Sequence, residues 1–240
     1  MSGGVDCVGF IYPDHAAESD YPRAARLLGV NLPVVHVYGT DLHAVPELME
    51  LGSPAKLADG AALLAPHRPA AVVWACTSGS FVFGPEGAAE QVDRLAARAG
   101  VPASSTSIGF VHALAALGYL HVAVAASYPR DIAELFADFL AAQGITVEKL
   151  GDAGIPTAAR VGRLTRRQVR ELALRNDTPR AEALLIPDTA MHTVTQVDEL
   201  ERLLGKPVLT ANAVTVWEGL RIAGIVRRTT GLGALFEDGR

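Results

Sequence analysis

The chain has 240 residues, half of them hydrophobic, which is enough for one large α/β domain or two small ones. Its formal net charge of -5 argues against a nucleic-acid-binding protein, which would carry a basic face. No apolar run reaches the roughly 18 to 20 residues of a membrane-spanning helix, no signal-peptide pattern is present, and the cysteines are too few for a disulfide framework. We therefore expect a cytoplasmic protein without nucleic-acid or membrane partners, and a homo-oligomer is compatible with the sequence.

Short apolar runs alternate with longer amphipathic segments along the whole chain. We expect strands at residues 5–11, 34–38, 71–75, 121–126, 146–150, 183–186 and 208–210. The helical spacing of apolar residues predicts helices at 87–99, 130–143 and 197–204, each followed closely by a glycine. Several strands are almost entirely apolar, as in parallel strands that are covered on both faces. The sequence therefore predicts an α/β fold with mostly parallel strands.

Three pairs of segments repeat in the same order in the two halves of the chain. The pairs are 12–18 with 128–134, 71–77 with 183–189, and 101–118 with 206–224. The alternative is chance likeness, because all strand–helix units share apolar strands and small-residue turns. We interpret the pairs as a duplication. It predicts an N-terminal lobe at 1–118, a C-terminal lobe at 119–224, and a tail at 225–240 that packs back on the N-terminal lobe.

The duplication places Cys76 and Asp188 at equivalent strand ends, each expected to lead into a helix N-terminus. Ligands of parallel α/β sheets bind at this edge, and helix N-termini favour anions. Hydroxyl groups surround the two positions, from Thr77, Ser78, Ser80 and Thr189. Two proton-handling groups on opposite sides of a small anion suit chemistry at a carbon beside a carboxylate. No nucleotide-binding glycine motif is present, so we expect no cofactor.

The segment ACTSGSF, residues 75–81, resembles the first motif of the aspartate/glutamate racemase superfamily. Within it, the chain is most similar to the branch of maleate cis-trans isomerases and arylmalonate decarboxylases, a likeness that extends to the segment GKPV…VWEGLRIAG. The resemblance implies two Rossmann-like lobes with parallel sheets, related by a pseudo-twofold axis. The active site would lie in the cleft between the lobes and would need no cofactor or metal.

The resemblance also implies roles for individual residues. Cys76 matches the first-half cysteine of the isomerases, and Asp188 stands where the family has a second cysteine. The hole that holds the substrate carboxylate would comprise the side chains of Thr77, Ser78 and Tyr128, completed by the backbone N–H groups of Asp188 and Thr189. Asp14 lies near an asparagine of the isomerases. The decarboxylases keep the second cysteine and lack the first, which is the reverse of this chain.

These residues leave three reactions open. Asp188 as base and Cys76 as acid would move a proton between faces; a Cys76 thiolate would add to an alkene; or Cys76 would protonate a carbanion after decarboxylation. We rank isomerisation of a small carboxylic acid above decarboxylation, for which Ile155, Pro156 and Val214 could line an apolar pocket. Asp188 as a mere helix cap, and a non-catalytic acid-binding protein, are the structural alternatives. The seven histidines show no metal-binding spacing.

Overall fold

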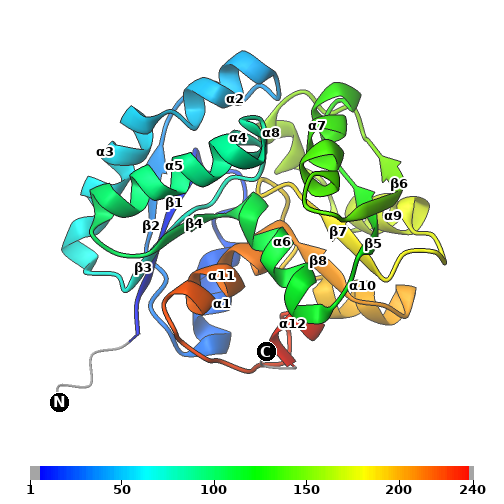
Figure 1. The fold of residues 1–240 in the computed structure, drawn as a ribbon. Coiled ribbons are helices and arrows are strands. Elements are labelled where there is room, and N and C mark those ends of the chain that lie inside the picture. The colour runs from blue at the N-terminus through cyan, green and yellow to red at the C-terminus, as the bar shows by residue number, and fades with distance from the viewer. Residues whose placement is uncertain (1–5, 238–240) are drawn as a thin grey trace.

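Parallel strands form two four-stranded sheets in the computed structural model, which describes residues 6–237 (Figure 1). The first sheet has the order β2 (Val34–Val37), β1 (Val8–Pro13), β3 (Ala71–Trp74) and β4 (Ala103–Ser105). The second has the order β6 (Thr146–Gly151), β5 (His121–Ala125), β7 (Ala183–Ile186) and β8 (Val208–Thr210). The two orders are equivalent, as a duplicated unit requires. The predicted α/β class and its two lobes are therefore confirmed.

Every predicted strand is present, with ends that shift by a few residues. The start of the first strand, at Val5, lies outside the described residues. Its end moves on to Pro13, because β1 continues to pair with β2 up to Val37. The strands β3, β5 and β7 are buried along nearly their whole length, which explains their continuous apolar runs.

Helices follow the strands on both faces of each sheet. The N-terminal half contains α1 (Asp20–Leu28), α2 (Val45–Leu51), α3 (Pro54–Leu64), α4 (Ser78–Phe81), α5 (Gly84–Ala99) and α6 (Thr106–Leu117), with a 3-10 turn, η1 (Ala65–His67). The C-terminal half contains α7 (Arg130–Ala141), α8 (Ala158–Val161), α9 (Arg166–Asn176), α10 (Val197–Leu204), α11 (Ala211–Ile222) and α12 (Ala234–Glu237). The three predicted helices are confirmed as α5, α7 and α10.

Helix α11 joins the two halves, lying between the sheets in Figure 1. It follows β8 of the second sheet but packs against β3, β4 and α6 of the first half. Gly219 makes this approach possible, because a Cβ there would meet Val8 at 2.6 Å. One hydrophobic cluster consequently extends from Val8 to Phe236 through both halves.

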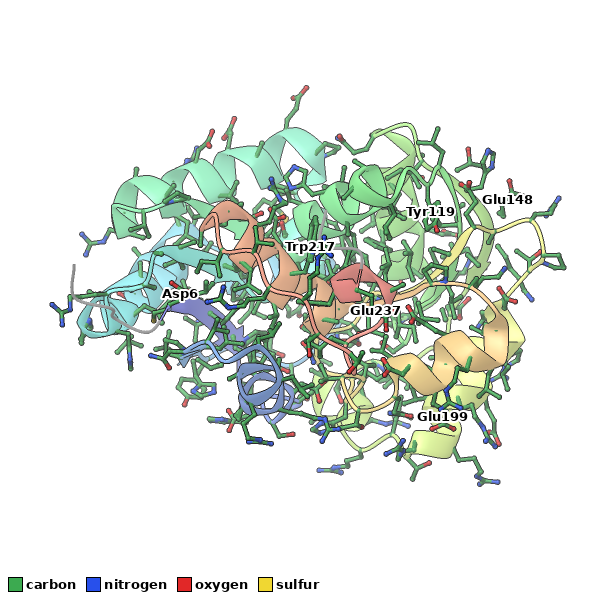
Figure 2. The ribbon with its side chains drawn as sticks, turned by 90° about the horizontal axis from the view of Figure 1, so that it is seen from below. Asp6, Tyr119, Glu148, Glu199, Trp217 and Glu237 are labelled. Carbon is green, nitrogen blue, oxygen red and sulfur yellow. The ribbon has the colours of Figure 1, made fainter. Side chains whose placement is uncertain are left out.

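The chain after α11 contacts both halves. The Thr229 hydroxyl donates to the carbonyl of Leu27, while the Ala234 amide donates to the Glu201 carboxylate on α10. In Figure 2 this segment ends at Glu237 beside Trp217, on the face seen from below. Within residues 6–237, no helix is long and apolar enough to cross a membrane.

Candidate active site

One cavity is lined by residues of both halves, at the carboxyl ends of the strands. The N-terminal half contributes Tyr12, Pro13, Asp14, Gly39, Thr40, Asp41, Leu42, His43, Leu48, Leu51, Cys76 and Ser78. The C-terminal half contributes Ala158, Asp188, Thr189 and Ala190. Cys76 and Asp188 are thus placed at one cavity, as their equivalent strand ends predict. Both are almost fully buried, with exposed fractions of 4% and 3%.

The thiol of Cys76 sits at the start of α4, two residues after β3. The amide of Gly79 donates to its Sγ at 3.3 Å, and the Ser78 hydroxyl lies 3.8 Å from the sulfur. Burial raises the pKa of Cys76 to about 11, although these two contacts oppose the rise, and the charge of Asp188 raises it further. Cys76 is therefore a neutral thiol at physiological pH in the substrate-free protein. This state suits a proton donor.

Thr77 carries a buried hydroxyl that has no hydrogen-bond partner among residues 6–237. The neighbouring Tyr128 is also buried, and its hydroxyl donates to the carbonyl of Pro187 at 3.0 Å. Neither side chain lines the cavity, whereas Ser78, Thr189 and Asp14 do. An unpaired buried hydroxyl costs free energy unless a ligand supplies its partner, and Thr77 lies directly between the cavity-lining residues Cys76 and Ser78.

Ser80 does not belong to this group of hydroxyls. Its Oγ donates to Ser105 at 2.8 Å and accepts from Ser107 at 2.8 Å. The expected role of Ser80 as a donor to the ligand is wrong, because its hydroxyl is already engaged in the packing of α4 against α6.

Asp188 follows β7 and accepts hydrogen bonds on both carboxylate oxygens. The Ser127 hydroxyl donates to Oδ2, and the backbone amide of Ala190 donates to Oδ1 at 2.9 Å. The expected helix after Asp188 is wrong: a turn follows, and the next helix begins only at Val197. Asp188 bonds its own backbone two residues on, which stabilises a turn instead of a helix start. Its carboxylate nevertheless reaches the cavity.

His43 is a cavity residue that the sequence did not reveal. Its Nε2 lies 3.9 Å from Oδ2 of Asp188, and its ring packs edge-on against Tyr128. Its Nδ1 lies 3.0 Å from the carbonyl oxygen of Ile155. A carbonyl oxygen only accepts, so Nδ1 carries the proton and Nε2 faces Asp188. The two groups attract each other only when one more proton is held between them, on Nε2 or on the carboxyl.

The loop after β2 carries His43 and borders the cavity. Its backbone forms hydrogen bonds with the C-terminal half. The amide of His43 donates to the carbonyl of Pro156 at 2.8 Å, and Leu42 pairs with Thr157 in an antiparallel bridge. Asp41 binds α8, because its carbonyl accepts from the Ala158 amide at 2.9 Å. We call residues 39–43 the latch. Near the cavity, the latch makes the only backbone-to-backbone hydrogen bonds between the two halves within residues 6–237.

The apolar wall of the cavity also differs from expectation. Ile155, Pro156 and Val214 are absent from the lining within the described residues. The carbonyls of Ile155 and Pro156 hold His43 instead, and Val214 packs behind Gly109 on α6. The apolar lining residues include Pro13, Leu42, Leu48, Leu51, Ala158 and Ala190.

Comparison with known proteins gives a consistent group of relatives. The arylmalonate decarboxylase family matches residues 53–236. Arylmalonate decarboxylase of Bordetella bronchiseptica is 30% identical over 145 residues, 58% of this chain and 59% of that protein. Maleate isomerase of Alcaligenes faecalis is 25% identical over 134 residues, 55% of this chain and 53% of that protein. The matched part thus spans somewhat more than half the length of these curated relatives.

The whole fold also has a solved counterpart. The maleate isomerase Iso from Pseudomonas putida S16 superposes with a TM-score of 0.90, covering 99% of this chain and 100% of that chain. At 19% sequence identity this match demonstrates a shared fold. The relatives fall in the branch that the motif around Cys76 predicts.

Proposed function

The chain belongs to the arylmalonate decarboxylase family, and on that premise we propose that it is a cofactor-independent isomerase of the maleate isomerase and aspartate/glutamate racemase type. Its substrate would be a small carboxylic acid that is altered at the carbon next to the carboxylate. The supporting observation is that the thiol of Cys76 and the carboxylate of Asp188 line the same buried cavity. They are an acid and a base, contributed by the two halves of the molecule.

The proposed reaction is a proton transfer across the substrate. The Asp188 carboxylate removes the proton from the α-carbon, and the C–H electron pair moves onto the substrate carboxylate to form an enediolate. The Cys76 thiol then gives its proton to the opposite face of that carbon, leaving a thiolate and a protonated Asp188. Exchange of these protons with solvent resets the enzyme. The raised pKa of Cys76 favours this acid role, because the thiol is protonated when substrate arrives.

The enediolate needs donors that hold its two oxygens. Thr77 supplies a buried hydroxyl without a partner of its own, and Ser78 lines the cavity beside the thiol. Donors fixed before the reaction stabilise developing charge without reorganising, which is how such a hole lowers a barrier. We propose that Thr189 contributes to this hole and that Asp14 borders the substrate. Tyr128, whose hydroxyl donates to the carbonyl of Pro187, would support the hole from behind its lining.

We propose that His43 accepts the proton that Asp188 has taken from the substrate. The bond from Nδ1 to the Ile155 carbonyl fixes its tautomer, so that Nε2 can receive the proton that Asp188 takes from the substrate. The imidazole, which is itself part of the latch, would then pass this proton on toward solvent.

A decarboxylase is the second candidate, favoured by the family match and by the protonated thiol. In that reaction the C–C electron pair remains on the α-carbon as carbon dioxide leaves, and Cys76 supplies the proton. A third candidate, a non-catalytic acid-binding protein, would use the same cavity without turnover. The two free, buried thiols fit a reducing compartment, so the cytoplasm remains our proposed location.

Incubation in heavy water separates these candidates. The protein is incubated with maleate, a 2-arylpropionate, aspartate and an arylmalonate, and products are followed by NMR. We expect deuterium at the α-carbon of one acid. Conversion of maleate into fumarate would instead assign an isomerase in which a Cys76 thiolate adds to the alkene. Carbon dioxide released from the arylmalonate would assign the decarboxylase. Binding without any conversion or exchange would contradict both enzymes and leave the binding protein.

A further inference from the structure

Two histidines and a glutamate meet on the surface beside the end of β1, outside the catalytic cavity. His15 and Glu18 lie in the turn between β1 and α1, and His36 lies on β2. One ligand atom from each of the three side chains lies within 4.8 Å of the others. The imidazole rings of His15 and His36 are 4.0 Å apart between centroids.

Strand register creates this cluster, which explains why spacing along the sequence does not show it. Tyr12 on β1 pairs with His36 on β2. The chain then turns back at Asp14, whose φ of 52° is in the left-handed region, and this turn directs His15 toward β2. Glu18 follows three residues later and reaches both imidazoles.

The distances suit a small divalent ion. Oε2 of Glu18 lies 2.9 Å from Nδ1 of His15 and 2.5 Å from Nε2 of His36. Ligands at the usual zinc distances are roughly 3.3 Å apart around a tetrahedral ion. The Glu18 carboxylate therefore has to withdraw only slightly, and its exposed fraction of 43% leaves it free to move.

Surrounding groups hold the ligands in orientation. Nε2 of His15 lies 3.2 Å from the Tyr38 hydroxyl, so that Nδ1 is the nitrogen directed at the centre of the cluster. The ring of His36 is stacked on Tyr38 and meets the edge of Tyr12. Such a second layer of contacts is typical of metal ligands.

We propose that His15, Glu18 and His36 form a site for one divalent metal ion of the zinc type. Two imidazoles and one carboxylate suit Zn²⁺, and also Co²⁺ and Ni²⁺, with the remaining coordination position left to water. The ion would fasten the turn that contains Asp14 to β2, at the rim of the catalytic cavity. This inference stands independently of the proposed function.

Direct metal titration tests the site. Chelator-treated full-length protein is titrated with Zn²⁺ in competition with a chromophoric chelator. We expect saturation at one ion per chain at pH 7.5 and weaker binding at pH 5.5, because histidine has an unperturbed pKa of about 6.5. Zinc should also raise the melting temperature of the wild-type protein. The double variant His15→Ala/His36→Ala should lose both effects.

His121→Ala is the matched control, because His121 forms a similar pair with Glu148 at 2.9 Å but belongs to no three-ligand group in the described residues. This variant should bind zinc like the wild type. Two results would overturn the site: no saturable binding by the wild type, or stoichiometric binding that persists in the double variant. In the second case, a thiolate absorption band with Co²⁺ would assign the ion to a cysteine.

Discussion

At the scale of a single residue, removal of the Thr77 hydroxyl should lower activity without lowering stability. It is buried and has no partner among residues 6–237, so it contributes nothing favourable to the substrate-free fold. In Thr77→Val we expect unchanged or slightly higher stability to denaturant. We expect kcat to fall about 100- to 1,000-fold, as when one donor of an oxyanion hole is lost.

Thr193→Val provides the control for that change. Thr193 also has a buried hydroxyl without a partner in the described residues, but it lies in the loop before α10, whereas Thr77 stands between the cavity-lining residues Cys76 and Ser78. Its variant should behave like Thr77→Val in denaturation and like the wild type in turnover. Equal losses of activity in both variants would remove Thr77 from the proposed hole.

The pH dependence of turnover distinguishes the two roles of Cys76. Burial, the largest cause, raises its pKa to about 11, so the acid form persists far above neutrality. If Cys76 donates a proton, kcat should stay level from neutral pH to about pH 10 and fall as the pH passes the pKa. A thiolate nucleophile would instead give a rate that rises about tenfold per pH unit up to that pKa. Stopped assays over this range decide between them.

Single residues also mark the limit of what the sequence could predict. Cys76, Asp188, Ser78 and Thr189 were predicted at the cavity because equivalent strand ends of a duplicated sheet face one cleft. His43 was not, because it lies in a loop whose position depends on the carbonyl groups of Ile155 and Pro156, more than a hundred residues away. A backbone contact of that kind leaves no pattern in the side chains.

At the scale of elements, the latch joins the two halves over the cavity. Asp41 binds the start of α8 twice: its carbonyl accepts from Ala158, and its Oδ2 accepts from the Ala159 amide at 3.3 Å. Asp41→Ala removes the side-chain bond, and one hydrogen bond contributes about 0.5–1.5 kcal/mol. We expect KM to rise about 2- to 12-fold.

Steady-state kinetics of Asp41→Ala should be compared with those of Asp93→Ala. Asp93 is exposed on α5, away from the latch. A KM that is unchanged in both variants would contradict a role for the latch in holding substrate.

The elements themselves were the most predictable part of the fold. Buried parallel strands need continuous apolar runs, and such runs located β3, β5 and β7. The short strand β4, Ala103–Ser105, has no such run and was not among the predicted strands. Another missed feature was the turn after Asp188. An aspartate followed by small and hydroxyl residues begins a helix or a turn equally well, and the Ala190 amide on its carboxylate selects the turn.

At the scale of the whole molecule, α11 crosses from the second sheet to cover the first. A repeat in sequence cannot reveal which sheet a helix covers, so this crossing was not predicted. We keep the division into lobes at 1–118 and 119–224, with a tail at 225–240, as a proposal, with α11 as the helix they share.

Glu218 secures that crossing. It is fully buried on α11 and accepts from Ser104 at 2.6 Å, beside His112 at 2.9 Å and Arg221 at 2.7 Å. Burial opposes its charge, but these contacts lower the pKa of Glu218 overall. A carboxyl group with a lowered pKa stabilises the fold above its unfolded pKa, and this stabilisation is lost as pH falls through the lowered value.

Glu218→Gln should therefore reduce the free energy of unfolding by about 1–3 kcal/mol at neutral pH. The difference from the wild type should shrink in acid. Glu199→Gln breaks an exposed ion pair with Arg166 at 3.1 Å and should change the free energy of unfolding by less than about 1 kcal/mol. Chemical denaturation at several pH values measures both variants, and equal losses would refute the stabilising role of Glu218.

The central claim is that Cys76 and Asp188 serve opposite faces of one carbon. The most direct measurement is deuterium exchange into each pure enantiomer of whichever chiral acid the wild-type protein converts. We predict that Cys76→Ala and Asp188→Asn both fold, that both lose interconversion of the enantiomers, and that each retains exchange with only one enantiomer, a different one for each variant. Interconversion at the wild-type rate in Cys76→Ala, or exchange confined to the same enantiomer in both variants, would contradict the account.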